Sequence, residues 1–456
     1  MSDIDNLRDK MDEVTLEMIK LLKQRTIIAK EIGNIKKDLG MNVTDEKREK
    51  SLRSKVVSLC SEKGIDEAIG TRFLNFLLNE SIKVQTTIKQ THLSIFLKAK
   101  SLEEQGKSII HMEVGEPDFP PPKIVKDALE EVYDKGFVKY GQVKGMSQFL
   151  TALAKKTNEK YTLDIKKENI IVCPGARYAV FLAITTLLNP GDEIIVIEPA
   201  WPAYKDCAEN AGVKVRTIKT SLENKWVPSV NEIKETLNVN TKMIVLNYPN
   251  NPTGKILPEK ILNEIMELVI KNELYVLSDE IYEQYSYEDW KSVLSYNYEK
   301  AIITQSFSKS HSMTGFRIGY AISSPRIVEK MAKLQAICLT NVSEPMQYVA
   351  MKALEADTSN NSNIVKSRLD VMIKKASEIG LDFVKPDGAM YIFAKVKKDD
   401  FDANEFSNKL LDYGLAVAPG GGFGDFKKFI RLSACQDEKK LVEGMNILDD
   451  VLNGRK

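Results

Sequence analysis

Apolar residues in the first 40 positions recur in steps of three and four. They stand at positions 4, 7, 11, 14, 18, 21, 28, 32, 35 and 39, and the one interruption is Arg25. Such steps place the side chains along one side of a helix, as in the seam of a coiled coil. The pattern predicts one long helix. Two shorter helices are expected over about 45–62 and 66–88, divided near Gly64, which gives an all-helical module of residues 1–88.

The pattern changes from Gly115 onward to short apolar runs that alternate with helical stretches. These runs lie at 170–172, 194–197, 243–246, 274–277 and 301–304. Uninterrupted, β-branched-rich strands are typical of a parallel sheet that is buried on both faces. We therefore predict an α/β unit over 91–456, with a large parallel-sheet domain of about 130–350 and a small α+β domain of about 91–129 plus 351–456.

Composition marks the same boundary and excludes several classes of function. Residues 1–116 contain no proline, tyrosine or tryptophan, whereas four prolines occur between positions 117 and 122. The net charge of +1 gives no electrostatic basis for binding nucleic acid or a membrane surface. Five scattered cysteines and three scattered histidines suggest neither disulfides nor a metal site. The charged first residues lack the apolar core of a signal peptide, and we expect a cytoplasmic protein.

Polar or Gly/Pro-rich segments follow the predicted strands directly: CPGAR, EPAWPAY, NYPNNPTG, SDEIY and QSFSKS. Ligands of open α/β sheets bind at the carboxyl ends of the strands, so these segments predict one site. Lys309 could be desolvated there and form a Schiff base with an aldehyde. Asp279 could keep a pyridine nitrogen protonated, and the turn Gly175-Ala176-Arg177 opens a helix that could bind a phosphate. These are the three groups that pyridoxal phosphate requires.

The helical module presents charged side chains at positions that suit a small dianion. Arg25 interrupts an apolar seam, and a buried guanidinium needs an anionic partner. Lys36 lies eleven residues further on the same stripe, about 16 Å away. Helical spacing also groups two sets of side chains, which are Asp45 with Arg48 and Glu49, and Ser81 with Gln85.

Four segments of the module, LRDKMD, LLKQRTIIAKEIGNIK, DEKREK and NESIKVQ, resemble the small all-helical class of chorismate mutases. The resemblance covers about residues 4–88. It implies that Arg25, Arg48 and Ser81 bind the substrate carboxylates, that Asp45 and Glu49 meet the hydroxyl, and that Lys36 and Gln85 bond the ether oxygen; Lys36, Gln85 and Glu49 would be catalytic. Arg8 also matches, but it precedes Arg25 by about 25 Å of helix, so a second chain must supply it.

The α/β unit resembles the class I/II aminotransferases of fold type I from about residue 91 to the C-terminus. The motifs are VGEPDF, NYPNNPTG, SDEIY, SFSKSHSMTGFRIGY and FIRLSAC. The resemblance implies a set of pyridoxal phosphate contacts: Lys309 on the aldehyde, Asp279 on the ring nitrogen, Asn251 and Tyr282 on the ring hydroxyl, Trp201 on the ring face, and Gly175, Ala176, Arg177, Ser306 and Arg317 on the phosphate, with Tyr140 from a partner chain. It further implies that Arg431 binds the substrate α-carboxylate and that Gly115 leaves room for it.

The two modules together predict a bifunctional enzyme of aromatic amino acid biosynthesis. It would rearrange chorismate to prephenate and transfer an amino group from glutamate or aspartate to prephenate or an arylpyruvate. One alternative is an aspartate:2-oxoglutarate aminotransferase fused to the mutase. Another makes the first module a non-catalytic dimerisation or ligand-sensing domain, and a third makes the second module a pyridoxal phosphate lyase or decarboxylase. Expected partners are chorismate, amino acids and 2-oxo acids, and a second copy of the chain in a homodimer or larger oligomer.

Overall fold

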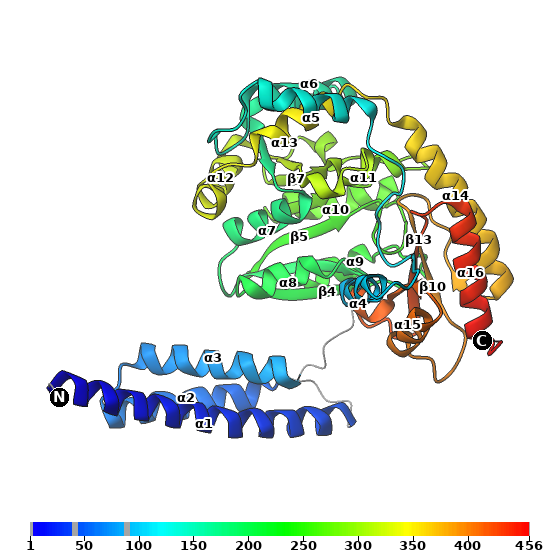
Figure 1. Cartoon of the computed structure of the whole chain (residues 1–456). Coiled ribbons are helices and arrows are strands. Elements are labelled where there is room, and N and C mark those ends of the chain that lie inside the picture. Colours follow the sequence, from blue (N-terminus) through cyan, green and yellow to red (C-terminus); the bar gives the residue numbers. More distant parts are fainter. Residues whose placement is uncertain (1–2, 39–43, 86–91, 456) are drawn as a thin grey trace. The chain divides into compact units, whose positions relative to one another are not determined.

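The computed structural model describes residues 3–38, 44–85 and 92–455. The chain divides into two compact units, Met1–Lys89 and Gln90–Lys456 (Figure 1). Within the described ranges, no helix has both the length and the apolar character that a membrane span needs.

The first unit is built from three helices. They are α1 (Asp3–Asp38), α2 (Glu46–Lys63) and α3 (Glu67–Gln85). Asp45 caps α2 by accepting a 3.0 Å hydrogen bond from the Arg48 backbone N–H, and Gly64 ends α2 at a positive φ of 66°. Helix α3 packs against both α1 and α2. The three helices predicted from the apolar spacing are therefore present.

Helix α1 carries an apolar stripe that the other described helices of the first unit do not cover. The side chains of Ile4, Leu7, Met11 and Val14 are 59, 65, 67 and 61% exposed. These are the first positions of the predicted seam, and they lie on one side of the helix.

A seven-stranded sheet forms the centre of the second unit, in the order β2-β8-β7-β6-β5-β3-β4. Its strands are β2 (Ile170–Cys173), β3 (Glu193–Glu198), β4 (Lys214–Lys219), β5 (Thr241–Asn247), β6 (Tyr275–Asp279), β7 (Ala301–Ser306) and β8 (Gly319–Ile322). Successive residues face opposite sides of the sheet, and in the inner strands they are buried on both sides, whereas the edge strand β4 is largely exposed or half-buried. In β5, Ile244 and Leu246 enter one apolar core, whereas Met243 and Val245 enter another.

Helices cover both faces, which explains why the strands read as uninterrupted apolar runs. They are α5 (Lys123–Asp134), α6 (Ser147–Tyr161), α7 (Ala176–Leu187), α8 (Ala203–Asn210), α9 (Val230–Thr236), α10 (Glu259–Lys271), α12 (Pro325–Leu339) and α13 (Glu344–Ala353). In Figure 1, α5, α6 and α13 lie together on one side of the sheet, and α13 contacts both of the others.

The prediction of an all-parallel sheet is wrong in one strand. Strand β8 runs antiparallel to both β2 and β7. Between β7 and β8 lie only the short helix α11 (Phe307–Ser310) and one 3-10 turn, so the chain turns back beside β7 without a crossover helix. The sheet is therefore mixed.

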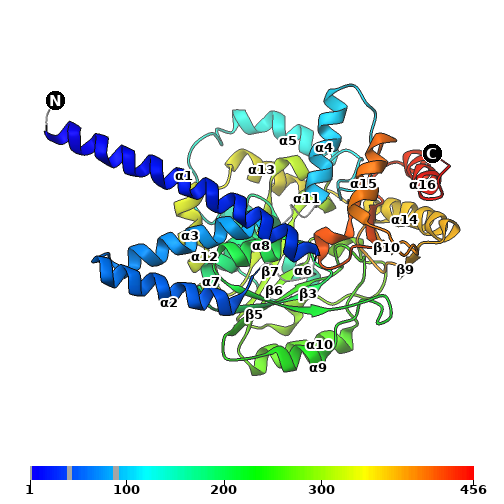
Figure 2. The ribbon, with the colours of Figure 1, turned by 90° about the horizontal axis from the view of Figure 1, so that it is seen from below.

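A smaller lobe holds the remaining elements. They are α4 (His92–Glu104), β1 (Ile110–His111), α14 (Ser359–Ile379), β9 (Asp382–Phe383), β10 (Tyr391–Lys395), α15 (Ala403–Asp412), β11 (Leu415–Ala416), β12 (Ala418–Pro419), β13 (Phe429–Ser433) and α16 (Glu438–Leu452). Strands β12, β13, β10 and β9 form an antiparallel sheet, and β1 pairs with β11. Figure 2 shows α14 and α16 beside β10 at one end of the unit. The predicted fold class, a helical module followed by an α/β unit with a small α+β lobe, is confirmed.

Candidate active sites

A cavity of about 570 Å³ lies at the carboxyl ends of the central strands. It gathers most of the residues that the sequence predicted for a cofactor and its substrate. Those that line it are Gly115, Ala176, Arg177, Trp201, Asn251, Asp279, Tyr282, Ser306, Lys309, Arg317 and Arg431. These residues come from separate segments of the chain, and the order of the strands brings them to one edge.

Lys309 lies in α11, directly after β7, and its ammonium donates a hydrogen bond to the Gly115 carbonyl. Burial lowers the pKa of Lys309, and the nearby guanidinium groups of Arg431 and Arg317 act in the same direction. A lower pKa increases the fraction of neutral amine, which is the form that attacks an aldehyde.

Asp279 ends β6 and is 2% exposed. The Tyr204 hydroxyl donates to its Oδ2 at 2.7 Å and the Thr304 hydroxyl donates to its Oδ1 at 3.0 Å. Burial raises the pKa of Asp279, and these hydrogen bonds oppose the rise. Among the described residues, no cation forms an ion pair with this buried carboxylate, so a protonated pyridine nitrogen fits the arrangement.

An anion site lies at the N-terminus of α7. Gly175 is the N-cap with a φ of 87°, and a Cβ there would come 2.6 Å from Nη2 of Arg317. The hydroxyls of Ser306, at the end of β7, and of Ser308, in α11, are 2.9 Å apart. Helix N–H groups, a guanidinium and hydroxyls are the donor set that a phosphate requires, so these residues fit the phosphate of pyridoxal phosphate.

Arg431 lies in β13 and is 2% exposed. Its Nη1 donates to Oδ1 of Asn251 at 2.9 Å, and its Nη2 donates to the Glu113 carbonyl. Its Nε is buried with no hydrogen-bond partner in the described ranges. The guanidinium lies 4.4 Å from the Tyr391 ring centre. A buried cation that contacts neutral oxygens fits a substrate carboxylate.

Several predicted residues have contacts that the sequence did not indicate. The Tyr282 hydroxyl lies 2.8 Å from that of Tyr391. The Arg177 guanidinium lies 4.7 Å from the centre of the Trp201 ring. Tyr140 is 88% exposed and does not line the cavity of its own chain.

Sequence reasoning missed Tyr204, Asn247 and Tyr391, which also line the cavity. Tyr204 falls within EPAWPAY, one of the segments that follow a strand, so its position was a usable signal. Tyr391 lies in the small lobe, far along the chain, and only the tertiary fold brings it near Arg431.

The first unit has its own cavity of about 690 Å³. Six predicted residues line it: Arg25, Lys36, Asp45, Arg48, Glu49 and Ser81. Arg25 Nη1 donates to Ser81 Oγ, which in turn donates to the Leu77 carbonyl at 2.8 Å. Leu21, Ile28 and Ile32 add an apolar wall. The cavity thus combines cations, carboxylates and apolar surface.

Two predicted residues of this unit are not seen to line the cavity. Arg8 lies outside the cavity, and its guanidinium forms an exposed 3.5 Å ion pair with Asp5. The side chain of Gln85 lies outside the described residues.

Comparisons with known proteins match both units. The family model "Aminotransferase class I and II" matches residues 107–448, and "Chorismate mutase type II" matches residues 7–86. An aspartate aminotransferase of Thermotoga maritima is 36% identical over 78% of this chain and 95% of its own length. An aspartate/prephenate aminotransferase of Thermus thermophilus is 30% identical over 82% of this chain and 98% of its own length.

Solved structures agree with the sequence matches. A crystal structure of the aspartate aminotransferase from Thermotoga maritima superposes with a TM-score of 0.76 at 35% identity, covering 79% of this chain and 96% of that one. Membership of this family implies dependence on pyridoxal phosphate, in agreement with the donor set of the larger cavity. The chain belongs to the class I and II aminotransferases, carries an N-terminal chorismate mutase type II domain, and is an enzyme with both activities.

Proposed function

We propose that this chain is a bifunctional enzyme of aromatic amino acid biosynthesis. Its mutase domain converts chorismate to prephenate, and its aminotransferase domain transfers an amino group from aspartate or glutamate to prephenate or to an arylpyruvate. The observation that carries the proposal is the presence of both sites in one chain. The Thermus thermophilus relative, named for prephenate as well as aspartate, supports it.

The mutase reaction is a unimolecular rearrangement, so its site must fix a conformation and stabilise charge. Arg25 and Arg48 bind the two carboxylates, with Ser81 positioned by its hydrogen bond from Arg25. Asp45 and Glu49 meet the hydroxyl, and Lys36 donates to the ether oxygen as its bond to carbon breaks. The side chain of Gln85 is assigned to that oxygen by resemblance alone.

In the aminotransferase site, pyridoxal phosphate supplies an aldehyde that bonds the substrate nitrogen and a ring that accepts electrons. Lys309 would hold the aldehyde, and its neutral amine would move the proton at the substrate Cα. Asp279 would keep the proton on the ring nitrogen, and the Tyr204 hydroxyl fixes the carboxylate by donating to its Oδ2. Arg317, Ser306 and the Gly175 turn would hold the phosphate. Asn251 and Tyr282 would contact the ring hydroxyl, and Trp201 would pack on the ring. Arg431 orients the substrate by its α-carboxylate.

Arg177 is the cation available for a second carboxylate. It lines the cavity next to Trp201 and forms no ion pair within the described part of the chain. Burial lowers the pKa of Arg177, and the charge of Arg317 adds to this effect. A bound anion would offset both the burial of the Arg177 charge and its repulsion by Arg317. Aspartate, glutamate and prephenate carry a second carboxylate, whereas phenylalanine does not.

Replacement of Arg177 by glutamine should therefore raise the KM for aspartate and glutamate about 10- to 100-fold, the loss expected for a charge-assisted hydrogen bond. The KM for phenylalanine should change less than about threefold. Steady-state kinetics with the three donors measures this difference. Equal increases for all three would assign Arg177 to the cofactor phosphate instead.

A second copy of the chain completes the mutase domain in this proposal. The exposed apolar stripe of α1 lies on the same part of the helix as Arg8. Arg8 is too far from Arg25 to enter the cavity of its own chain, so we assign it to the cavity of a second copy. Replacement of Met11 by aspartate should place a charge in that interface, lower the oligomeric mass and reduce mutase activity at least about tenfold. Light scattering and a mutase assay measure both. Unchanged mass with full activity would show that α1 is not an interface.

The substrate assignment is tested by steady-state transamination with prephenate, phenylpyruvate, 4-hydroxyphenylpyruvate and oxaloacetate as acceptors. The proposal predicts that prephenate or an arylpyruvate has the highest kcat/KM. Use of oxaloacetate alone would favour the alternative, an aspartate:2-oxoglutarate aminotransferase joined to a mutase, which the name of the Thermotoga maritima relative supports.

A further inference from the structure

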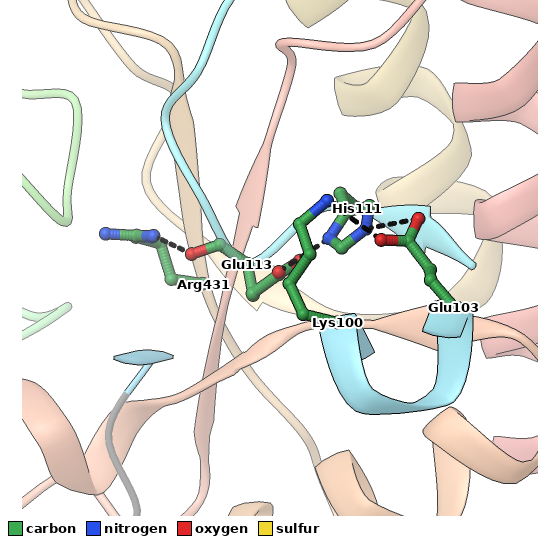
Figure 3. A network of polar contacts seen from close by, with 5 residues as sticks. All are labelled: Lys100, Glu103, His111, Glu113 and Arg431. Carbon is green, nitrogen blue, oxygen red and sulfur yellow. Dashed lines mark hydrogen bonds and ion pairs between the residues drawn. The ribbon is translucent and has the colours of Figure 1, made fainter. Parts of the chain in front are cut away.

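His111 lies between the carboxylates of Glu103 and Glu113 (Figure 3). Its Nδ1 is 2.8 Å from Oε1 of Glu113, and its Nε2 is 3.1 Å from Oε1 of Glu103. Only 13% of the His111 side chain is exposed, and Glu113 is fully buried. Oε2 of Glu113 has no hydrogen-bond partner among the described residues, and Oε1 contacts His111.

When Glu103 and Glu113 are both ionised, both contacts can be hydrogen bonds only if the imidazole carries two protons. An ionised carboxylate can only accept, and a neutral imidazole has a single N–H. The hydrogen bond to Glu113, followed by the charges of both glutamates, raises the pKa of His111 against the effect of burial. Lys100 is paired with Glu103 at 2.8 Å, and the residues of β11 beside β1 are apolar.

The segment that carries His111 is fixed to the small lobe by its main chain. The Met112 N–H donates to the Ala416 carbonyl at 2.9 Å, and the Met112 carbonyl accepts from the Ser433 N–H at 2.9 Å. Alternation along an extended chain then places His111 and Glu113 on the same side, toward α4.

The same segment contacts two groups of the candidate active site. The Glu113 carbonyl accepts from Arg431, and the Gly115 carbonyl accepts from Lys309. On the other side of His111, α4 provides Leu93 and Phe96 as walls of the cavity. The Phe96 ring centre is 6.1 Å from that of His111. His111 therefore adds a polar link between α4 and the backbone that contacts Arg431, beside the apolar packing of α4 on α15 and β11.

We propose that His111 is a positioning residue for substrate binding: its imidazolium, held by Glu103 and Glu113, fixes α4 and the 113–115 backbone in the arrangement that lets Arg431 bind the α-carboxylate. The proposal rests on the proposed role of Arg431. It extends that role by adding a group that does not touch the substrate yet controls its affinity.

The pH dependence follows from the direction of the shift. A raised pKa means that the imidazolium and both of its hydrogen bonds persist at and below the ordinary pKa of histidine and are lost as pH rises through the raised value. At a pH above the raised pKa, one ring nitrogen of the neutral His111 presents a lone pair to a carboxylate. The KM for the amino donor should then rise about five- to tenfold across this transition, with kcat changing less than about twofold.

The experiment compares the wild-type chain, loaded with cofactor, with three variants across pH. His111→Gln should remove the alkaline rise in KM, and Glu103→Gln should move it to lower pH, because one of the two carboxylates that raise the pKa is gone. Glu104→Gln is the matched control, since this exposed neighbour on α4 undergoes the same chemical change. It should behave as the wild type.

A second readout is independent of activity. With labelled histidines, nuclear magnetic resonance should give His111 a pKa above its ordinary value in the wild type and a lower one in Glu103→Gln. An unchanged alkaline rise in His111→Gln, or the same His111 pKa in Glu103→Gln as in the wild type, would overturn the proposal. Failure of the Arg431 role is separate: Arg431→Gln would then leave donor KM unaltered at every pH.

Discussion

Replacement of Lys309 by alanine is expected to abolish transamination and to leave chorismate mutase activity intact. Lys309 is the buried amine of the larger cavity, and its lowered pKa supplies the neutral form that both bonds an aldehyde and moves a proton. The remaining residues can still bind the cofactor and the substrate, but none is placed to replace that amine at α11. The kcat for transamination should fall roughly 10⁴-fold or more.

Two controls separate this effect from misfolding. Lys333→Ala removes an exposed lysine of α12 and should retain full activity. Mutase activity of the Lys309→Ala chain, measured as disappearance of chorismate, should match the wild type because the other unit contains that site. The visible absorbance of cofactor bonded to the lysine should also be lost. Transamination above about a tenth of the wild-type rate would contradict the assignment.

Replacement of Arg25 by alanine should have the opposite selectivity. The Arg25 guanidinium lies in the smaller cavity and contacts Ser81. Its loss would leave a substrate carboxylate without its charge-assisted hydrogen bonds and would free Ser81 from its partner. We expect mutase kcat/KM to fall roughly 10²- to 10³-fold, with transamination unchanged.

Arg53→Ala is the matched control for Arg25. Arg53 is an exposed arginine of the same helical unit that bonds Asn75 at 2.7 Å and does not line the cavity. The Arg53→Ala substitution should lower mutase kcat/KM by less than about threefold. Arg25→Lys keeps the charge without the two-pronged geometry and should recover part of the loss. Equal activities for Arg25→Ala and Arg53→Ala would exclude the proposed carboxylate contact.

Residues at strand ends were predictable because one rule places them. Lys309, Asp279 and Gly175 each follow an apolar run, and parallel strands bring such positions to one edge. The direction of β8 was not predictable from its residues, since an apolar strand carries no mark of its orientation. It depends on the short connection through α11, which the sequence pattern did not distinguish from a crossover.

Contacts between distant segments were beyond the sequence. Tyr204 reaches Asp279 because α8 packs beside the sheet, and no spacing rule relates these two positions. The same holds for Glu103 and His111, which lie on a helix and a strand whose packing is a tertiary property. In the helical unit, by contrast, helix periodicity by itself groups Asp45, Arg48 and Glu49, and all three line one cavity.

The most direct test of the bifunctional assignment gives the full chain, loaded with pyridoxal phosphate, only chorismate and aspartate. Prephenate formed by the first unit, or an arylpyruvate derived from it, should serve as the amino acceptor of the second unit. Oxaloacetate should then appear as chorismate disappears. Arg25→Ala and Lys309→Ala should each stop the formation of oxaloacetate. Chorismate consumed without any loss of aspartate, in a preparation that readily transaminates 2-oxoglutarate with aspartate, would contradict the account.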